Sequence, residues 1–139
     1  QDQIDIPPPP KVTEYLIRQD SEMVVYSIDC YILGYMKDDD KEIHIVIQDI
    51  KNNSIMVAEI PSIECEALKK TSRYRKFVKL TQWFEKNIGI PTSKYKTVDL
   101  KFKVNIVGVG FFDYVHGQKG LPKNGRELHP VLEMKFLNQ

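Results

Sequence analysis

The chain has 139 residues, 42% of them hydrophobic and 28% charged, which is typical of one globular domain with a single core. No run of roughly 18 apolar residues is present, so no transmembrane helix is expected. The formal net charge of +1 excludes a general attraction to nucleic acid or anionic membranes and leaves only local charge clusters to consider.

Residues 1–21 are predicted to be a proline-rich tether that precedes a single domain at residues 22–139. Four consecutive prolines, Pro7 to Pro10, favour an extended, water-exposed conformation. The sequence begins with Gln1 and carries no apolar leader, so we expect a mature exported form, periplasmic or extracellular, whose signal peptide has been removed.

Three strands are expected after the tether. The first, at residues 23–36, has Gly34 near its end, where a glycine often marks a bulge or a bend in a curled sheet. The second, at residues 42–49, alternates three isoleucines with other residues, which predicts one buried face and one outward face. The third spans residues 55–60 and stops at Pro61.

An amphipathic helix is predicted at residues 63–87, with Ser62 as its N-cap. The strongest alternation in the chain then predicts a fourth strand at residues 98–106. The last strand is expected at residues 127–137. Because proline cannot donate to a strand ladder, Pro130 within it predicts an edge position or a bulge.

Three strands, one helix and two strands is the element order of the OB-fold, a small five-stranded Greek-key barrel. A long first strand with a late glycine fits a strand that bends to serve both halves of such a barrel. The sequence therefore predicts a mainly β, OB-like barrel with one helix. An α+β sheet with one covering helix is the alternative.

Cys30 and Cys65 leave two interpretations open. In an oxidising compartment the pair would form a disulfide. The alternative is that both are small buried apolar residues, since Cys30 alternates with apolar positions of the first strand. Their spacing does not match a zinc site, because neither cysteine has a CxxC partner.

Asp113 and His116 lie three residues apart, and Glu127 and His129 lie two apart on one face of the last strand. If the last two strands pair, these side chains meet at one end of the barrel, where His44 of the second strand could join them. A carboxylate beside an imidazole orients a general base, and two imidazoles with a carboxylate hold a transition metal. The structural alternative is a hydrogen-bonded lock on a hairpin, which the glycines of this loop also favour.

Six cations of the predicted helix fall within 11 residues, with no acid among them. They are Lys69, Lys70, Arg73, Arg75, Lys76 and Lys79. They predict either a solvated face or a surface for an anionic partner, such as nucleic acid, a lipid headgroup or an acidic glycan. Tyr31, Phe111 and Phe112 are candidates for stacking on bases or sugars, and core packing is the alternative.

The segment at residues 108–136 reads GVGFFDYVHGQKGLPKNGRELHPVLEMKF. It resembles the signature GxGFFDxxHGQxG followed by NGxELHPV, which is typical of a family of small exported bacterial proteins. The segments HIVIQD (44–49) and VAEIP (57–61) resemble two further stretches of that family. The resemblance implies export and a related fold, and it implies no particular activity.

Three functions are consistent with these features. The first is an exported binding module that holds a polymeric or protein ligand on the barrel face and loops, with no catalytic residue and no cofactor. Its candidate binding residues are Asp113, His116, Gln118, Asn124, Glu127, His129, His44, Tyr31, Phe111 and Phe112. The second is a metal-dependent hydrolase or nuclease-like enzyme, with His116 and His129 and either Asp113 or Glu127 as metal ligands. The third is a structural or assembly protein that reaches its partner through the tether.

Overall fold

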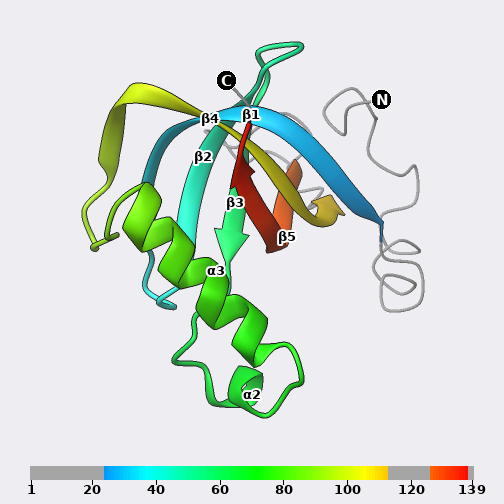
Figure 1. Ribbon diagram of the computed structural model, residues 1–139, viewed down its shortest axis with the longest axis vertical. Coiled ribbons are helices and arrows are strands. Elements are labelled where there is room, and N and C mark those ends of the chain that lie inside the picture. The colour runs from blue at the N-terminus through cyan, green and yellow to red at the C-terminus, as the bar shows by residue number, and fades with distance from the viewer. Residues whose placement is uncertain (1–23, 113–125, 138–139) are drawn as a thin grey trace, which may run out of the picture.

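Five strands close into a barrel in the computed structural model, which describes residues 24–112 and 126–137 (Figure 1). The strands are β1 (Val25–Lys37), β2 (Ile43–Asp49), β3 (Ile55–Ile60), β4 (Lys96–Phe112) and β5 (Arg126–Phe136). Their order around the barrel is β1-β2-β3-β5-β4, and β4 pairs back onto β1. The pair β3–β5 is parallel, and the other four pairs are antiparallel. This closed order confirms the OB-like barrel and excludes the open α+β sheet.

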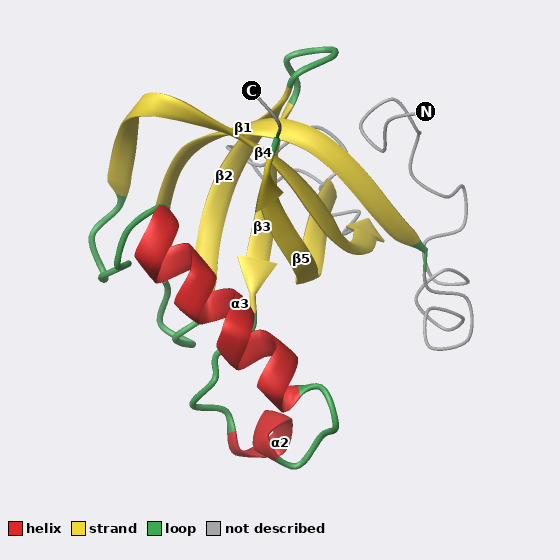
Figure 2. Ribbon diagram, in the orientation of Figure 1, coloured by secondary structure: helices red, strands yellow, loops and turns green. Residues whose placement is uncertain are grey.

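β1 bends at Gly34, as the position of this glycine predicts. The ladders of β1 with β2 and with β4 both shift register between Ile32 and Gly34. A Cβ built on Gly34 would overlap the ring of Tyr95, so the chain approaches that ring over a bare backbone. The bend lets one long strand arch over the barrel and pair along both of its edges (Figure 2).

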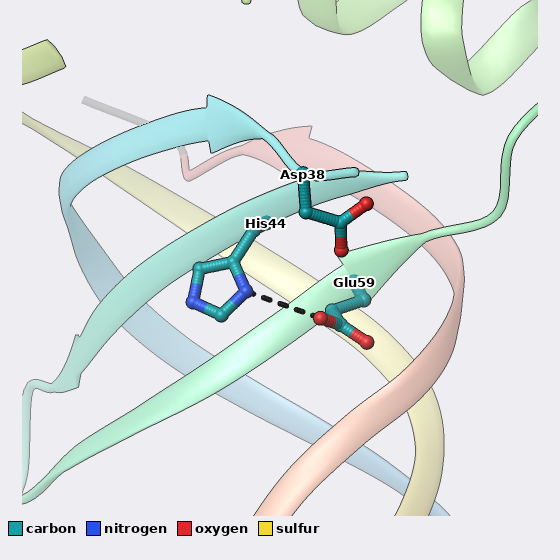
Figure 3. A group of neighbouring side chains, drawn as sticks. All are labelled: Asp38, His44 and Glu59. Carbon is teal, nitrogen blue, oxygen red and sulfur yellow. Dashed lines mark hydrogen bonds and ion pairs between the residues drawn. The ribbon is translucent and has the colours of Figure 1, made fainter. Parts of the chain in front are cut away.

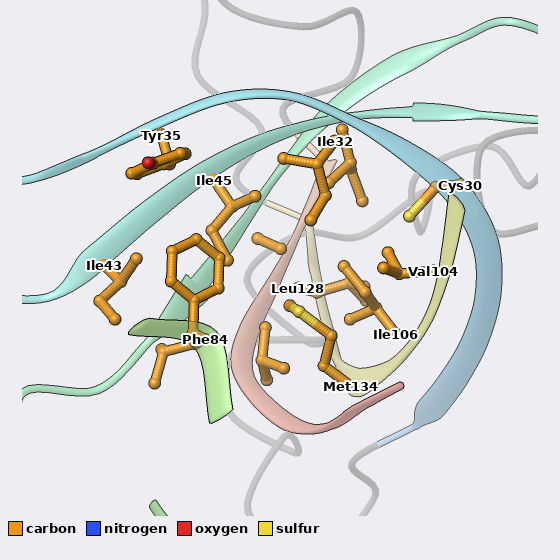
Figure 4. Close-up of a cluster of buried hydrophobic side chains, with 14 of the residues drawn as sticks. Cys30, Ile32, Tyr35, Ile43, Ile45, Phe84, Val104, Ile106, Leu128 and Met134 are labelled. Atoms are coloured by element: carbon orange, nitrogen blue, oxygen red, sulfur yellow. The ribbon is translucent and has the colours of Figure 1, made fainter. Parts of the chain in front are cut away.

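Apolar side chains from all five strands fill the barrel (Figure 4). The three isoleucines of β2 point inward and are at most 3% exposed. Helix α3 (Tyr74–Asn87) covers one end of the barrel, and its residue Phe84 meets the ring of Tyr35 edge-on, with the ring centroids 5.2 Å apart. Burial of this apolar surface is the main force that holds the strands in place.

The helix predicted at residues 63–87 is in fact two helices, α2 (Glu66–Lys69) and α3. The backbone leaves helical geometry between them, where the hydroxyl of Thr71 donates a hydrogen bond of 2.8 Å to the carbonyl oxygen of Leu68. Such a local side-chain bond competes with helix continuation. Among the described residues, no helix has the length and apolar character needed to cross a bilayer.

Ser62 is not the N-cap of a long helix. Its hydroxyl oxygen accepts a hydrogen bond of 3.1 Å from the N–H of Glu64 and closes a turn, and Cys65 stands at the N-cap of α2. Both cysteines are free, so the disulfide interpretation is wrong for this structure. The physical reason is their placement: Cys30 points into the barrel and is fully buried, whereas Cys65 is exposed at the start of α2.

β5 contains a bulge at Pro130, which is one of the two alternatives that the proline predicts. The ladder of β4 with β5 pairs Gly108 with Val131 and Gly110 with Leu128, and it shifts register on both sides of Gly108. Leu128 and Val131 both point inward, while His129 and Pro130 between them are half-exposed. Strand alternation after Leu128 directs His129 outward, and the bulge keeps Pro130 outward beside it before Val131 returns to the core.

Candidate functional site

The outward side chains of β2 and β3 form one surface of the barrel, which we call the β2–β3 face. It consists of His44, Val46, Gln48, Ile55, Val57 and Glu59. The ladder of the two strands sets His44 opposite Glu59, Val46 opposite Val57 and Gln48 opposite Ile55. The face therefore combines an apolar middle with a polar pair at the end nearest the loop between β1 and β2.

His44 and Glu59 form the first contact of the site (Figure 3). Nδ1 of His44 donates a hydrogen bond of 3.1 Å to Oε2 of Glu59. The bond favours a protonated imidazole and an ionised carboxylate, so it raises the pKa of His44 and lowers the pKa of Glu59. Burial opposes both shifts, because the Glu59 side chain is only 14% exposed and the His44 side chain 32%.

His129 brings β5 into the same contact network. The parallel ladder pairs Val57 with Glu127, and continuing this register places His129 beside Glu59. Nδ1 of His129 lies 3.7 Å from Oε1 of Glu59, and Nε2 of His129 lies 3.2 Å from Oε2 of Glu42. Glu42, His129, Glu59 and His44 thus follow one another in an unbroken series, which we call the His–carboxylate cluster.

The loop between β1 and β2 (residues 38–42) borders this cluster. Oδ1 of Asp38 accepts hydrogen bonds from the N–H groups of Asp40 at 2.9 Å and Glu42 at 3.0 Å, which fixes the turn. Lys41 adopts a positive φ of 67° in the same turn. The Asp38 carboxylate lies close to both His44 and Glu59 (Figure 3). The loop therefore holds Asp38 and Glu42 against the barrel face.

A pocket of about 640 Å³ adjoins the cluster on the side of α2. It is lined by Asp40, Glu42, Pro61, Ser62, Cys65, Ala67, Leu68 and Thr71. Its walls are largely apolar, and Asp40 and Glu42 bring carboxylates to it. Because Glu42 also contacts His129, the pocket and the His–carboxylate cluster share a side chain.

Acidic groups dominate this part of the molecule. By sequence, the β2–β3 face, the adjoining start of β5 and the β1–β2 loop carry two cations, Lys41 and Arg126, and six carboxylates: Asp38, Asp39, Asp40, Glu42, Glu59 and Glu127. Burial raises the pKa of the Glu42 carboxyl, although the neighbouring His129 acts in the opposite direction. The local field therefore favours a cationic ligand and disfavours a phosphate or an acidic sugar.

Two of the predicted site residues, His44 and His129, contact the same carboxylate of Glu59. Glu127 lies two residues before His129 on the outward side of β5, as predicted. Tyr31 is half-exposed on β1, with the ammonium group of Lys103 5.9 Å from the centre of its ring. A cation therefore lies near its ring, in contrast to the carboxylates of the cluster.

Other predicted residues cannot be assigned to the cluster. Asp113, His116, Gln118 and Asn124 lie outside the described residues. Phe111 and Phe112 end β4, and only their backbone belongs to the described structure. The carboxylates that contact His129 are Glu42 and Glu59, which the sequence interpretation does not include.

Glu59 could have been found from the sequence. The hairpin of β2 and β3 turns at residues 50–53, and counting outward from that turn pairs Gln48 with Ile55 and His44 with Glu59. Glu42 carries no such signal. Its contact with His129 joins residues 87 positions apart and depends on barrel closure and on the bulge at Pro130.

The six cations of the helical region are all exposed. Nζ of Lys69 lies 3.2 Å from Oε2 of Glu66 in the same helix, and Nζ of Lys76 lies 3.8 Å from Oε2 of Glu133 in β5. These exposed pairs contribute little to stability. The helical region thus presents a basic surface. Its residues Ala67 and Leu68 line the same pocket as Asp40 and Glu42 of the acidic β1–β2 loop.

The resemblance of residues 108–136 to a family of exported bacterial proteins stays a prediction. The middle of that motif lies outside the described residues, and its last part forms β5. No protein-family model matches the chain, and no curated protein or solved structure matches it either.

Proposed function

We propose that this protein is a small binding module that holds a basic segment of a protein partner on its β2–β3 face and in the adjoining pocket. The observation that carries the proposal is the concentration of carboxylates at one end of that face, beside a pocket of about 640 Å³. OB-fold barrels commonly bind ligands on the face of their second and third strands and with the loop that precedes the second strand.

The charge of the face selects among the ligands that such barrels bind. Six carboxylates against two cations give this region a negative field, which attracts lysine- or arginine-rich segments and repels phosphates. Val46, Val57 and the half-exposed Ile55 offer apolar contact for the stems of such side chains. A protein partner is therefore favoured over an oligonucleotide or an acidic glycan.

Export to the periplasm or to the outside of the cell is part of the proposal. It is supported by the resemblance of residues 108–136 to the exported family. Expression of the complete gene in a bacterium, followed by fractionation, tests it: we expect the protein in the periplasmic or extracellular fraction, and recovery from the cytoplasm alone would contradict export.

The binding test uses a fluorescein-labelled octalysine peptide, with octaglutamate and an eight-residue oligothymidylate as comparison probes. In buffer with EDTA, fluorescence anisotropy should show binding of octalysine and of neither comparison probe. Added salt should weaken the binding of octalysine. Asp40→Lys should weaken this binding by about 10-fold, because it reverses a charge at the pocket. The matched control is Asp99→Lys, an exposed acid on β4 outside the face, which should leave the affinity unchanged. Binding of the oligonucleotide in place of octalysine, or equal effects of both variants, would contradict the proposal.

Metal-dependent hydrolysis is the second candidate function. The observation that favours it is the position of Glu42, which lines the pocket and contacts the imidazole of His129. Zinc-loaded protein would be assayed with bis(p-nitrophenyl) phosphate and with a fluorogenic oligonucleotide. Activity that disappears in His129→Ala with an unchanged circular dichroism spectrum would support an enzyme, and no turnover of either substrate would argue against one.

A further inference from the structure

We propose that Glu42, Glu59 and His129 bind one divalent transition-metal ion of the zinc class, and that His44 positions Glu59 for this task. The inference deepens the assignment of the β2–β3 face as the binding face, on which it rests for its location. The three ligands come from the end of the β1–β2 loop, from β3 and from β5, so barrel closure assembles a site that no single segment contains.

The donor atoms have the chemistry and spacing that such an ion requires. An imidazole with two carboxylates suits zinc and its neighbours better than it suits calcium or magnesium, which prefer oxygen ligands alone. One donor atom from each of the three side chains lies within 4.8 Å of the other two. Ligand atoms that share a tetrahedral zinc at bond lengths of about 2.0–2.1 Å lie about 3.3 Å apart. Nε2 of His129 lies 3.2 Å from Oε2 of Glu42, which is close to this value, whereas the 3.7 Å contact of Oε1 of Glu59 is with the other ring nitrogen, Nδ1.

His44 contacts one of the proposed ligands, Glu59, and would hold it in place. It holds Oε2 of Glu59, while Oε1 of the same carboxylate faces His129. Metal-binding carboxylates are usually oriented by a hydrogen bond of this kind, which leaves the second oxygen for the ion. His44 is therefore a positioning residue in this assignment.

A competing set of donors shares Glu59. Asp38, His44 and Glu59 also bring one atom each within 4.8 Å of the others (Figure 3). In that set, Oδ1 of Asp38 already accepts two backbone hydrogen bonds that fix the β1–β2 turn, and Nδ1 of His44 already donates to Glu59. An ion in either set would replace one imidazole–carboxylate hydrogen bond, that of His44 with Glu59 or that of His129 with Glu42. Only the competing set would also use a carboxylate that fixes the loop, that of Asp38. The structure therefore favours the set with Glu42.

Three protein ligands leave one position of a tetrahedral ion for water or for a donor group of a partner. Glu42 lies at the border between this site and the pocket, so a ligand bound in the pocket would approach the ion from that side. With one divalent ion bound, the six carboxylates and two cations of the region still leave it negatively charged, which is compatible with a basic partner.

The experiment is calorimetric titration of the full-length, tag-free protein with zinc chloride after treatment with EDTA and dialysis. We expect one zinc ion per chain, and no heat of binding with magnesium chloride. Glu42→Gln, Glu59→Gln and His129→Gln should each weaken zinc binding by more than about 100-fold, because loss of an outer-shell partner alone costs roughly 10- to 100-fold. His44→Gln should weaken it by about 10-fold. The matched control is Asp38→Asn, which removes the acid of the competing set and should change the affinity by less than about 3-fold.

Two results would overturn the assignment: no zinc bound by the wild-type protein, or zinc binding that is lost in Asp38→Asn and retained in Glu42→Gln. A second measurement does not depend on variants that fold. Cobalt(II) added to the wild-type protein should give the intense visible absorption of a four-coordinate site, and its absence would also overturn the proposal. Because octalysine binding is measured in EDTA, failure of zinc binding leaves the binding-module proposal standing, and failure of octalysine binding leaves the zinc result standing.

Discussion

At the scale of single residues, Gly89 and Gly34 differ in how well each position would tolerate a side chain. Gly89 follows α3 with a φ of 157°, and a Cβ placed on it would overlap the hydroxyl group of Tyr35. Tyr35 is 2% exposed and lies against Phe84, so it has no room to move away. Gly34 faces Tyr95 in a similar way, but the Tyr95 side chain is 48% exposed and can rotate into solvent.

Gly89→Ala is therefore expected to lower the free energy of unfolding by about 2–4 kcal/mol, since it combines an unfavourable backbone angle with overpacking. Gly34→Ala serves as the control and should cost about 1 kcal/mol or less. Urea denaturation monitored by the fluorescence of Trp83 measures both. Equal losses in the two variants would show that burial of the facing tyrosine does not decide the cost.

Cys30 and Cys65 show the limit of sequence interpretation for single residues. The alternation of Cys30 with apolar neighbours indicates its buried position correctly, and burial raises the pKa of its thiol well above the usual range. The pattern around Cys65 contains no comparable signal. Cys65 lies at the N-cap of α2, where it is exposed.

At the scale of elements, the pair of β2 and β3 was the most predictable part of the molecule. Strict alternation of isoleucines sets the bounds of β2, and Pro61 ends β3 one residue after its last pairing. The contact of His44 with Glu59 follows from that hairpin alone. The contacts of His129 do not, because they require the parallel pairing of β3 with β5, which leaves no mark in the local sequence.

The His44–Glu59 pair predicts a pH dependence of stability in the metal-free protein. The raised pKa of His44 stabilises the fold fully below the unfolded value of 6.5, and this contribution is lost as pH rises through the folded pKa. The lowered pKa of Glu59 stabilises the fold above 4.5, and this contribution is lost as pH falls through the folded pKa. Asp38 and Glu127 also face His44 and act in the same direction on its pKa.

The stability difference between the wild-type protein and His44→Gln in EDTA should therefore be largest near about pH 5.5 and smaller toward pH 3 and pH 8. Its size should stay below about 1 kcal/mol, because the imidazole is about one-third exposed and solvent screens the pair. Urea denaturation across this pH range provides the measurement. A difference that does not change with pH would mean that the pair contributes packing and no ionic stabilisation.

At the scale of the whole molecule, charge is separated between neighbouring surfaces. The acidic β1–β2 loop and the basic helical region meet at the pocket, where Asp40 and Glu42 face Ala67 and Leu68. A net charge of +1 hides this arrangement, since it sums over both surfaces. Composition therefore argues only against a general electrostatic function and says nothing about a local one, which depends on the fold.

The five strands and two helices of the described part of the chain lie at residues 24–112 and 126–137, and this placement predicts the effect of removing residues 1–21. The shortened protein should keep its melting temperature to within about 2 °C, because the apolar core that these elements form remains in place. Differential scanning calorimetry of both forms checks this. A clear loss of stability would show that the proline-rich segment belongs to the domain and is no tether.

Among the described residues, the ladder between β3 and β5 pairs Val57 with Glu127 and Ala58 with Leu128, and it is the shortest of the five ladders. Just beyond it, His129 joins the two strands through Glu59 and reaches Glu42 of the β1–β2 loop. Side-chain contacts of His129 thus extend the junction of β3 and β5 beyond its two backbone pairs. Separation of β3 from β5 would break these contacts. A ligand that joins the two strands therefore also opposes opening of the barrel, so ligand binding and folding are thermodynamically linked.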